Sequence, residues 1–411
     1  MSQQQGPIIV VSDDKQPAFM AALDEGGMFP VIETTWAEAS RAIAQLQPAI
    51  VLAVAPEGAG AELESIAGQI GRIQPYLPLL VIDPKGSLPE NAIPFSQGKA
   101  GWERLLQRLR AALRVRTLHA TVLRRLNDQT VKTEVAEIDP VRDATVLLVG
   151  RAGGYPALSV ALGECMGVMG ALSVEAAAKH LNTRDIDGVV LGEGFTDRVV
   201  DAFLTVLSED PRFRNLPIVV TRAGLVLAYN LPNLEVIAGD PAYVAANALP
   251  LIRQHAFEAH LSRTLRSIDA GGLLDPLTGL LTASAFDRDL AAVVSQTLAN
   301  GGGLSVARFA FDPAHSRAQL DAARLLSRLM RQMDFGALRD DGSALVVFAE
   351  TDLRTAHVIA RRLSSVIKHT AHDNRETRRN EPAVSVATLM PQDTMQSLLA
   401  RLDDEGRRAA S

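Results

Sequence analysis

The stretch from Arg331 to Phe348 reads Arg-Gln-Met-Asp-Phe-Gly-Ala-Leu-Arg-Asp-Asp-Gly-Ser-Ala-Leu-Val-Val-Phe. Residues 340–342 form a polar Asp-Asp-Gly segment, and an apolar run over 345–348 follows it closely. Turn residues between two apolar runs are the signal of a β-hairpin. The stretch therefore predicts the end of an amphipathic helix, a short strand, a tight turn and a second strand.

A second motif lies upstream of this hairpin, at residues 275–280. Together the two motifs resemble the GGDEF family of diguanylate cyclases, which condense two GTP molecules into cyclic di-GMP. The family's opening Asp-x-Leu-Thr-Gly-Leu is matched by Asp275, Leu277, Thr278, Gly279 and Leu280, with Phe286 and Leu290 at the usual later positions. The family's hairpin signature, Gly-Gly-(Asp/Glu)-Glu-Phe, corresponds here to Asp340, Asp341, Gly342, Ser343 and Ala344. The resemblance implies an α+β domain with a mainly antiparallel sheet over 259–411.

Composition limits the classes of function that the chain can have. At 411 residues the chain is long enough for about three domains, and 47% hydrophobic residues supply several cores. A net charge of −6 gives no basic footprint, so nucleic acid is not an expected partner. The longest apolar run, Pro48–Pro56, is too short to span a bilayer, so no membrane insertion is expected. The one cysteine, Cys165, excludes an internal disulfide and indicates a cytoplasmic protein.

The first part of the chain alternates apolar runs with amphipathic segments. Strands are predicted at 8–11, 31–32, 50–54 and 79–82, with helices at 36–46, 60–72 and 101–114. Such alternation predicts an α/β fold with a parallel sheet covered on both faces. The order and size resemble a response-regulator receiver domain, a flavodoxin-like doubly wound sheet, over 1–117. A linker is predicted over 118–141.

The phosphorylation chemistry of this first receiver-like domain is incomplete. In the receiver family an acidic pair after the first strand holds Mg²⁺, and an aspartate at the end of the third strand accepts the phosphoryl group. Asp13 and Asp14 match the acidic pair, but the third strand ends Ala53-Val54-Ala55 without a carboxylate. A phosphoryl acceptor needs an ionised nucleophile beside the metal, so no phosphorylation is predicted. Asp13 and Asp14 are interpreted as exposed loop acids, with a retained metal site as the open alternative.

Residues 142–258 repeat the architecture without repeating the sequence. Strands are predicted at 145–149, 188–191, 218–221 and 234–237, with helices at 155–164, 174–182, 197–208 and 241–257. The segment resembles a second receiver, in which Gly150 and Arg151 replace the acidic pair and Glu193 lies one place beyond the acceptor position. Thr221 stands where receivers carry a switch hydroxyl. Two receivers, a helical connector at 254–274 and a GGDEF domain form the layout of PleD-type cyclase regulators and of their non-catalytic relatives of the PopA kind.

The resemblance also implies that the chemistry of the third domain has been lost. The two family glycines that let the backbone approach the GTP phosphates are Asp340 and Asp341 here, whose carboxylates repel phosphate. The next two family positions are acidic and serve the metal and the 3′-hydroxyl, but here they are Gly342 and Ser343. Ala310 stands where the first strand should end in a metal-binding aspartate. We therefore predict no catalytic residue, no metal site, no cofactor and no enzyme activity.

One family site is retained just before the hairpin. Many GGDEF domains bind cyclic di-GMP through an Arg-x-x-Asp motif, which Arg331 and Asp334 match with the usual spacing, and through a second arginine, matched by Arg362. Guanine N7 and O6 suit a guanidinium fork, and a carboxylate accepts hydrogen bonds from the N1–H and N2–H₂ edge. The competing interpretation is an ordinary surface ion pair at helical spacing. The neighbouring Arg324 and Arg328 are interpreted as solvated.

Three functions remain open from the sequence. The favoured one is a non-catalytic cyclic di-GMP effector, in which the receivers mediate homodimerisation or partner binding. By resemblance, its protein partners are a regulator or factors for proteolysis and localisation, and the protein is cytoplasmic and located at a cell pole. The second is an interaction scaffold without a nucleotide ligand, and the third is a residual diguanylate cyclase.

Overall fold

The protein is described by a computed structural model, which leaves the placement of several segments undefined. It describes residues 6–13, 17–28, 30–54, 60–97, 102–128, 144–151, 153–222, 229, 231–311, 316–331, 333–368 and 382–410. The chain divides into two compact units, which are treated separately. One comprises Met1–Leu181 with Ile186–Leu261, and the other comprises Asn182–Asp185 with Ser262–Ser411.

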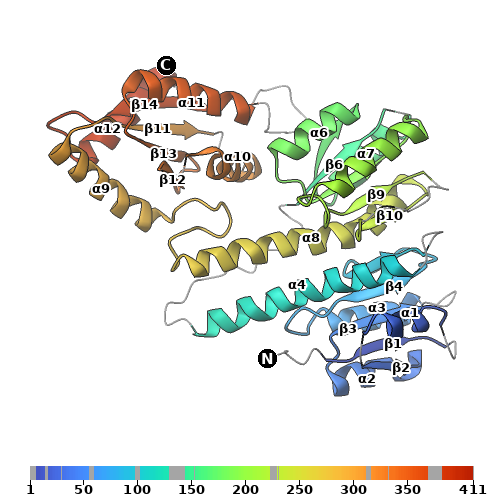
Figure 1. Ribbon diagram of the computed structural model, residues 1–411. Coiled ribbons are helices and arrows are strands. Elements are labelled where there is room, and N and C mark those ends of the chain that lie inside the picture. The colour runs from blue at the N-terminus through green and yellow to red at the C-terminus, as the bar shows by residue number, and fades with distance from the viewer. Residues whose placement is uncertain are drawn as a thin grey trace. The chain divides into compact units, whose positions relative to one another are not determined.

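The first unit contains two five-stranded parallel sheets of the same topology (Figure 1). The first sheet comprises β1 (Ile8–Val11), β2 (Val31–Thr34), β3 (Ile50–Val54), β4 (Leu79–Ile82) and β5 (Ala92–Phe95), in the order β2-β1-β3-β4-β5. Its helices are α1 (Met20–Glu25), α2 (Trp36–Leu46), α3 (Gly60–Ile70) and α4 (Glu103–Asp128). Strands β1, β4 and β5 are buried along their whole length, as expected for a sheet covered on both faces.

The second sheet repeats this order. It comprises β6 (Thr145–Val149), β7 (Gly167–Ala171), β8 (Gly188–Leu191), β9 (Ile218–Val220) and β10 (Leu234–Val236), in the order β10-β9-β8-β6-β7. Its helices are α5 (Tyr155–Gly163), α6 (Val174–Thr183), α7 (Asp197–Glu209) and α8 (Pro241–Asp269). Both sheets are parallel throughout, so the predicted parallel α/β architecture is confirmed. The predicted boundaries of the two domains, 1–117 and 142–258, stay predictions.

Several elements differ from those expected from the sequence. Strands β5 and β7 were not predicted, because the Pro94 of one and the two glycines of the other weaken the strand pattern. Helix α4 continues beyond 114 to Asp128, in agreement with the expectation that the polar segment from 115 begins as an extension of the preceding helix. The segments predicted at 241–257 and 254–274 form one helix, α8, which contains Pro250 and ends at Asp269.

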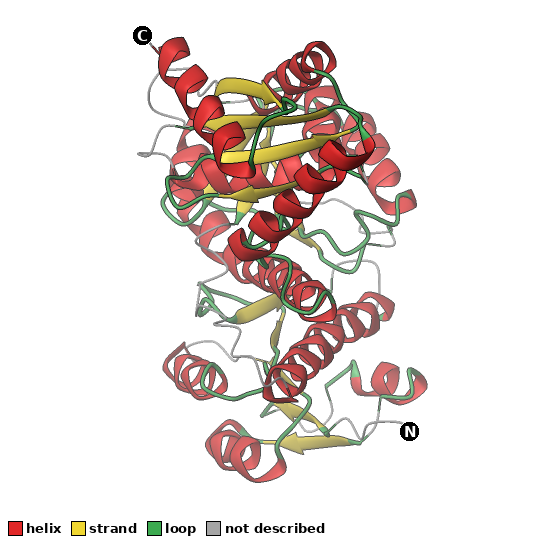
Figure 2. Ribbon diagram, turned by 90° about the vertical axis from the view of Figure 1, so that its left-hand side faces the viewer, coloured by secondary structure: helices red, strands yellow, loops and turns green. Residues whose placement is uncertain are grey.

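The second unit contains one antiparallel sheet with helices on both faces (Figure 2). The strands are β11 (Leu304–Ala310), β12 (Phe335–Leu338), β13 (Ala344–Ala349) and β14 (Ala383–Thr388), in the order β12-β13-β11-β14. The helices are α9 (Ala283–Asn300), α10 (Ser316–Leu329), α11 (Leu353–Lys368) and α12 (Met395–Ala410). One apolar cluster joins the sheet to α10 and α11, and another joins it to α9 and α12. The expected antiparallel α+β domain is thereby confirmed.

No helix in the described parts of the chain is both long enough and apolar enough to cross a membrane.

Candidate functional site

The motif at 275–280 forms a closed turn that contacts α10. The Asp275 carboxylate accepts hydrogen bonds from the Leu277 N–H at 3.0 Å and from the Thr278 hydroxyl at 2.6 Å. Gly279 has a φ of +74°, and a Cβ there would lie 3.0 Å from the Ser327 hydroxyl. The motif is therefore a structural turn, and glycine is required at its tight, left-handed position.

Arg324 fixes this turn to α10 and is not solvated as we expected. Its side chain is 7% exposed, and its Nε donates to the Leu277 carbonyl at 2.8 Å. The sequence pattern placed Arg324 on a polar helix face, but the turn at 275–280 covers that face. The expectation of a solvated arginine was therefore wrong at this position.

The predicted hairpin is confirmed. Strands β12 and β13 pair antiparallel with Leu338 opposite Ala344. In the connecting turn, Gly342 N–H donates to the Arg339 carbonyl at 2.9 Å and Arg339 N–H donates to the Ser343 carbonyl at 2.8 Å. Gly342 has a φ of +78°, and a Cβ there would collide with a side chain of α10. The left-handed φ of residue 342 by itself favours glycine in this turn.

Arg331 and Asp334 lie at the two ends of a short turn between α10 and β12. Helix α10 ends at Leu329, so the motif follows the helix and does not belong to it. The Asp334 N–H donates to the Arg331 carbonyl at 3.0 Å, which closes the turn. Arg331 is exposed, and within the described residues its guanidinium forms no hydrogen bond or ion pair. The competing interpretation, a surface ion pair at helical spacing, therefore does not describe this turn.

Asp334 lies deeper than expected. It is 9% exposed, whereas the sequence suggested a surface position, and its Oδ1 accepts a hydrogen bond from the Ala349 N–H at 3.3 Å. Burial raises the pKa of this carboxyl above its ordinary value, while the Ala349 N–H and the Arg331 charge act in the opposite direction. Asp334 thus supports the end of β13 in addition to any role toward a ligand.

Arg362 lies on the exposed outer face of α11, which packs with α10 on the same side of the sheet. Among the described residues no hydrogen bond or ion pair joins it to Arg331 or Asp334. The structure therefore brings Arg331 and Asp334 together, and it places Arg362 on a neighbouring helix without direct contact.

The hairpin tip is held by two arginines that sequence reasoning did not identify. Arg308 of β11 donates to Asp341 at 2.6 Å and to Asp403 of α12 at 3.0 Å. Arg339 donates to Asp287 of α9 at 2.9 Å. A signal for Arg308 existed in the sequence, since it is the one charged residue in an otherwise uncharged strand, between the buried residues Ala307 and Phe309.

Asp341 is engaged within the hairpin itself. Its Oδ1 accepts the Ser343 N–H at 2.8 Å and the Ser343 hydroxyl at 2.6 Å. Partial burial raises the pKa of Asp341, but the bonds from Ser343 and the Arg308 guanidinium outweigh it, so the net pKa is below the ordinary value. The ionised form of the Asp341 carboxyl is therefore favoured at the tip of this hairpin.

In the first parallel sheet, the residues that the sequence analysis compared with a phosphorylation site lie near the carboxyl ends of β1 and β3. Ala53 is a buried strand residue, and Asp13 is exposed in the loop after β1. Asp14 and Lys99 lie outside the described residues.

In the second receiver-like domain, the corresponding positions surround a small cavity of about 130 Å³ at the carboxyl ends of β6, β8 and β9. Its lining includes Gly150, Tyr155, Glu193 and Thr221. The Thr221 hydroxyl donates to the Leu191 carbonyl at 3.3 Å. The half-buried Thr221 side chain thus bonds the end of the neighbouring strand β8.

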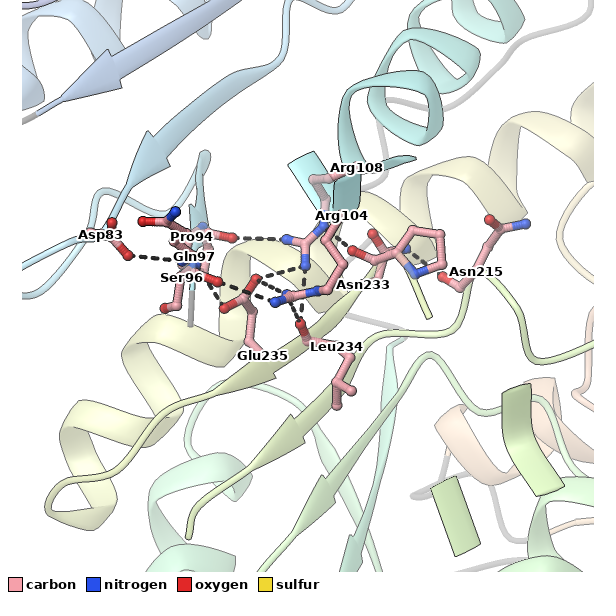
Figure 3. A network of polar contacts seen from close by, with 11 residues as sticks. Asp83, Pro94, Ser96, Gln97, Arg104, Arg108, Asn215, Asn233, Leu234 and Glu235 are labelled. Atoms are coloured by element: carbon pink, nitrogen blue, oxygen red, sulfur yellow. Dashed lines mark hydrogen bonds and ion pairs between the residues drawn. The ribbon is translucent and has the colours of Figure 1, made fainter. Parts of the chain in front are cut away.

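A buried ionic cluster joins the two receiver-like domains (Figure 3). Arg104 and Arg108 of α4 donate to Glu235 of β10 at 3.2 and 2.8 Å, and Glu235 also accepts the Ser96 N–H at 3.0 Å. Arg108 and Glu235 have fully buried side chains. Burial lowers the pKa of Arg108 to about 10 and raises that of Glu235, while their mutual attraction opposes both changes.

The comparisons with known proteins concern the GGDEF type of domain only. No family model matches the sequence, and no curated protein is similar to it. Among solved structures, the coiled coil and GGDEF domain of DgcB from Caulobacter crescentus, in complex with c-di-GMP, is 17% identical, with 36% of this chain and 86% of that chain covered and a TM-score of 0.30.

Two further structures show the same type of domain. A sensory box/GGDEF family protein from Caulobacter crescentus is 24% identical, with 34% of this chain and 97% of that chain covered and a TM-score of 0.28. The GGDEF domain of FimX from Pseudomonas aeruginosa is 20% identical, with 33% and 94% covered and a TM-score of 0.30. The similar structures are consistently GGDEF domains, but TM-scores of 0.28–0.30 do not assign a function to this chain.

Proposed function

We propose that this protein is a non-catalytic cyclic di-GMP effector whose degenerate GGDEF domain binds the nucleotide through Arg331, Asp334 and Arg362. The observation that carries the proposal is the turn between α10 and β12. It presents an exposed Arg331 guanidinium, which forms no hydrogen bond or ion pair with another described residue, beside a carboxylate that accepts a backbone hydrogen bond at 3.3 Å. A carboxylate held in place beside an exposed guanidinium suits a ligand that has both a guanine edge and a phosphate.

The chemistry of the ligand matches these groups one by one. A guanidinium fork binds guanine N7 and O6 or a phosphate oxygen, and it is always charged at neutral pH. Asp334 Oδ1 accepts a hydrogen bond from the Ala349 N–H, and the remaining lone pairs of the carboxylate would accept from the guanine N1–H and N2–H₂ edge. Arg362, on the neighbouring helix, supplies a second positive charge for the second phosphate.

Isothermal titration calorimetry with cyclic di-GMP tests this assignment. Arg331→Ala removes a charge-assisted hydrogen bond, which contributes about 1.5–3 kcal/mol, so affinity should fall at least about tenfold. Asp334→Asn is the better test of the acid because the amide oxygen still accepts from Ala349, whereas alanine would disturb β13. Arg361→Ala is the matched control, since Arg361 is exposed on α11 next to Arg362 and is not assigned to the site.

Three results would contradict the proposal in different ways. If the wild-type protein does not bind at tens of micromolar ligand, roughly −6 kcal/mol, the effector function fails and an interaction scaffold replaces it. If wild type binds but Arg331→Ala binds equally well, the ligand site lies elsewhere. An equal loss in Arg361→Ala and Arg362→Ala would show that only the overall charge of α11 matters.

The absence of cyclase activity is part of the same proposal. Asp341 of the hairpin accepts hydrogen bonds from Ser343 and Arg308, and its negative charge opposes the approach of a nucleoside triphosphate. Ser343 is 3% exposed and lacks the carboxylate that the two-metal reaction requires. These features weigh against the residual cyclase.

We also propose that the two domains of the first unit are receivers without phosphorylation chemistry. Their shared strand order, 2-1-3-4-5 within each sheet, is the flavodoxin-like doubly wound order, which supports this assignment. Their roles would be dimerisation of the chain and binding of a regulator or of proteolysis and localisation factors in the cytoplasm, including at a cell pole. Sedimentation of the purified protein tests the homodimer, and a purely monomeric chain would exclude it.

A further inference from the structure

The tip of the β12–β13 hairpin contains a cation supplied by the protein itself. The two terminal nitrogens of the Arg308 guanidinium donate to different carboxylates, Asp341 in the hairpin turn and Asp403 on α12. The distances are 2.6 and 3.0 Å, and the Arg308 side chain is 24% exposed. The Arg308 guanidinium therefore bridges two carboxylates, one in the hairpin turn and one on α12.

In an active GGDEF domain this region holds divalent metal, and the residues present here do not fit such a metal. Ala310, Gly342 and Ser343 stand at the family's acidic positions, so the first-strand and hairpin carboxylates are missing. Within the described parts of the chain, no group of three acidic, histidine or cysteine side chains is close enough to hold a metal ion. The two carboxylates that do remain nearby, Asp341 and Asp403, already bind a positive group.

We propose that the Arg308 guanidinium replaces the divalent cation as the resident positive charge of the hairpin. It holds the turn against α12 and neutralises part of the charge of Asp341 and Asp403 without any metal. A planar fork suits two carboxylates in this arrangement, since each terminal N–H group points at one oxygen. The hairpin is therefore fixed in a metal-independent way. This inference stands apart from ligand binding and does not require cyclic di-GMP.

The proposal predicts that a variant without Arg308 is stabilised by Mg²⁺. In Arg308→Ala, Asp341 and Asp403 lose their common cation and repel each other, which should loosen the turn. Hard divalent cations favour carboxylate oxygens, so Mg²⁺ should then bind between these acids and restore order. The wild-type protein should not respond to Mg²⁺ in this way, because the guanidinium occupies the position.

Differential scanning calorimetry and hydrogen exchange at the hairpin, each with EDTA and with millimolar Mg²⁺, test this prediction. We expect Arg308→Ala to lower the melting temperature by about 2–4 °C and to speed exchange of the Ser343 N–H. Mg²⁺ should reverse a large part of both changes. Arg339→Ala is the matched control, since it breaks the other hairpin ion pair, to Asp287, but leaves no pair of acids without a cation. It should lose stability without recovery by Mg²⁺.

Either of two outcomes would overturn the proposal. One is an Arg308→Ala protein that is insensitive to Mg²⁺ in both measurements. The other is a wild-type protein that Mg²⁺ stabilises as much as it stabilises the variant, because a metal would then bind with Arg308 in place. If Arg308→Ala does not fold, Arg308→Met keeps the apolar stem of the side chain and is measured in the same way, with the same two outcomes decisive.

Discussion

Glu235→Gln should be among the most destabilising single changes in this protein, although glutamine has nearly the same shape as glutamate. Glu235 has a fully buried side chain and accepts from both Arg104 and Arg108. The substitution leaves two buried guanidiniums without an anion. It also removes a charged acceptor from the Ser96 N–H, which lies 3.0 Å away. Because volume is conserved, a loss of stability would report charge and hydrogen bonding, not a cavity.

The magnitude follows from the burial of the cluster. Removing one partner of a buried ion pair costs about 3–5 kcal/mol, because the remaining charge is uncompensated. The arginines also donate to backbone carbonyls, including Arg108 to Pro94 at 2.8 Å, and these bonds survive the substitution. We therefore expect about 3 kcal/mol, the lower end of that range. The pair Arg114–Glu258 joins α4 to α8 and has side-chain exposed fractions of 45% and 22%, so Glu258→Gln should cost less than about 1 kcal/mol.

Tryptophan fluorescence during urea unfolding is the suitable assay. The chain has two tryptophans, Trp36 and Trp102, and both lie in the first receiver-like domain. Trp102 contacts Phe19 and Phe95, so its emission reports the packing of α4 on β5. The signal therefore follows the domain that carries the arginines without contribution from the second unit.

A double-mutant cycle with Arg108→Met decides whether the cluster acts as a unit. If the cluster is coupled, the double variant should be less destabilised than the sum of the single variants by at least about 1 kcal/mol. Additivity within about 0.3–0.5 kcal/mol, or a loss for Glu235→Gln no larger than that for Glu258→Gln, would refute the reasoning.

Three further predictions concern catalysis and pH. Purified protein with GTP and Mg²⁺ should form no cyclic di-GMP, and product above a control without protein, detected by chromatography, would return the residual cyclase to consideration. Cyclic di-GMP affinity should fall as the pH is lowered toward the raised pKa of Asp334, because only the carboxylate accepts from the guanine edge. Calorimetry at several pH values should show that the affinity of Asp334→Asn depends less on pH. A pH dependence equal to that of wild type would remove Asp334 from the site. Hydrogen bonds from Arg401 lower the pKa of Asp393 to about 2, below its unfolded value, so the stability from this pair is present above about pH 4 and is lost as the pH falls toward 2. Circular dichroism of Arg401→Ala should show a smaller loss of stability over that range, and a loss equal to that of wild type would exclude the pair as its cause.

The sequence predicted those parts of the fold that local patterns determine. The hairpin was predictable because a polar turn lies between two apolar runs, and the parallel sheets were predictable because their strands are continuous apolar runs. Strand β7 was missed because Gly167 and Gly170 interrupt its pattern, and a Cβ at Gly170 would lie 2.1 Å from the Tyr155 hydroxyl. Gly170 is needed because Tyr155 of α5 lies against it, and the sequence around Gly170 does not indicate this contact.

The site residues divide in the same way. The spacing of the motif selected Arg331 and Asp334 as candidate ligand-binding residues, but it did not reveal that Asp334 is buried, since its partner Ala349 lies at the end of β13. Arg308 and Asp403 are far apart in sequence, so only the packing of α12 against the sheet brings them together. Long-range ion pairs of this kind have no local signature, and this is why Glu235 was also missed.

The bond between Asp334 and the Ala349 N–H has a consequence for how relatives of this chain would lose the site during evolution. A lineage that no longer needs the ligand can discard Arg331 at little structural cost, since that side chain is exposed. It cannot discard the aspartate as easily, because the end of β13 depends on it. If the proposed site binds its ligand, the acid should therefore be retained longer than the arginine, and a related sequence that has the aspartate without the arginine would have lost the site.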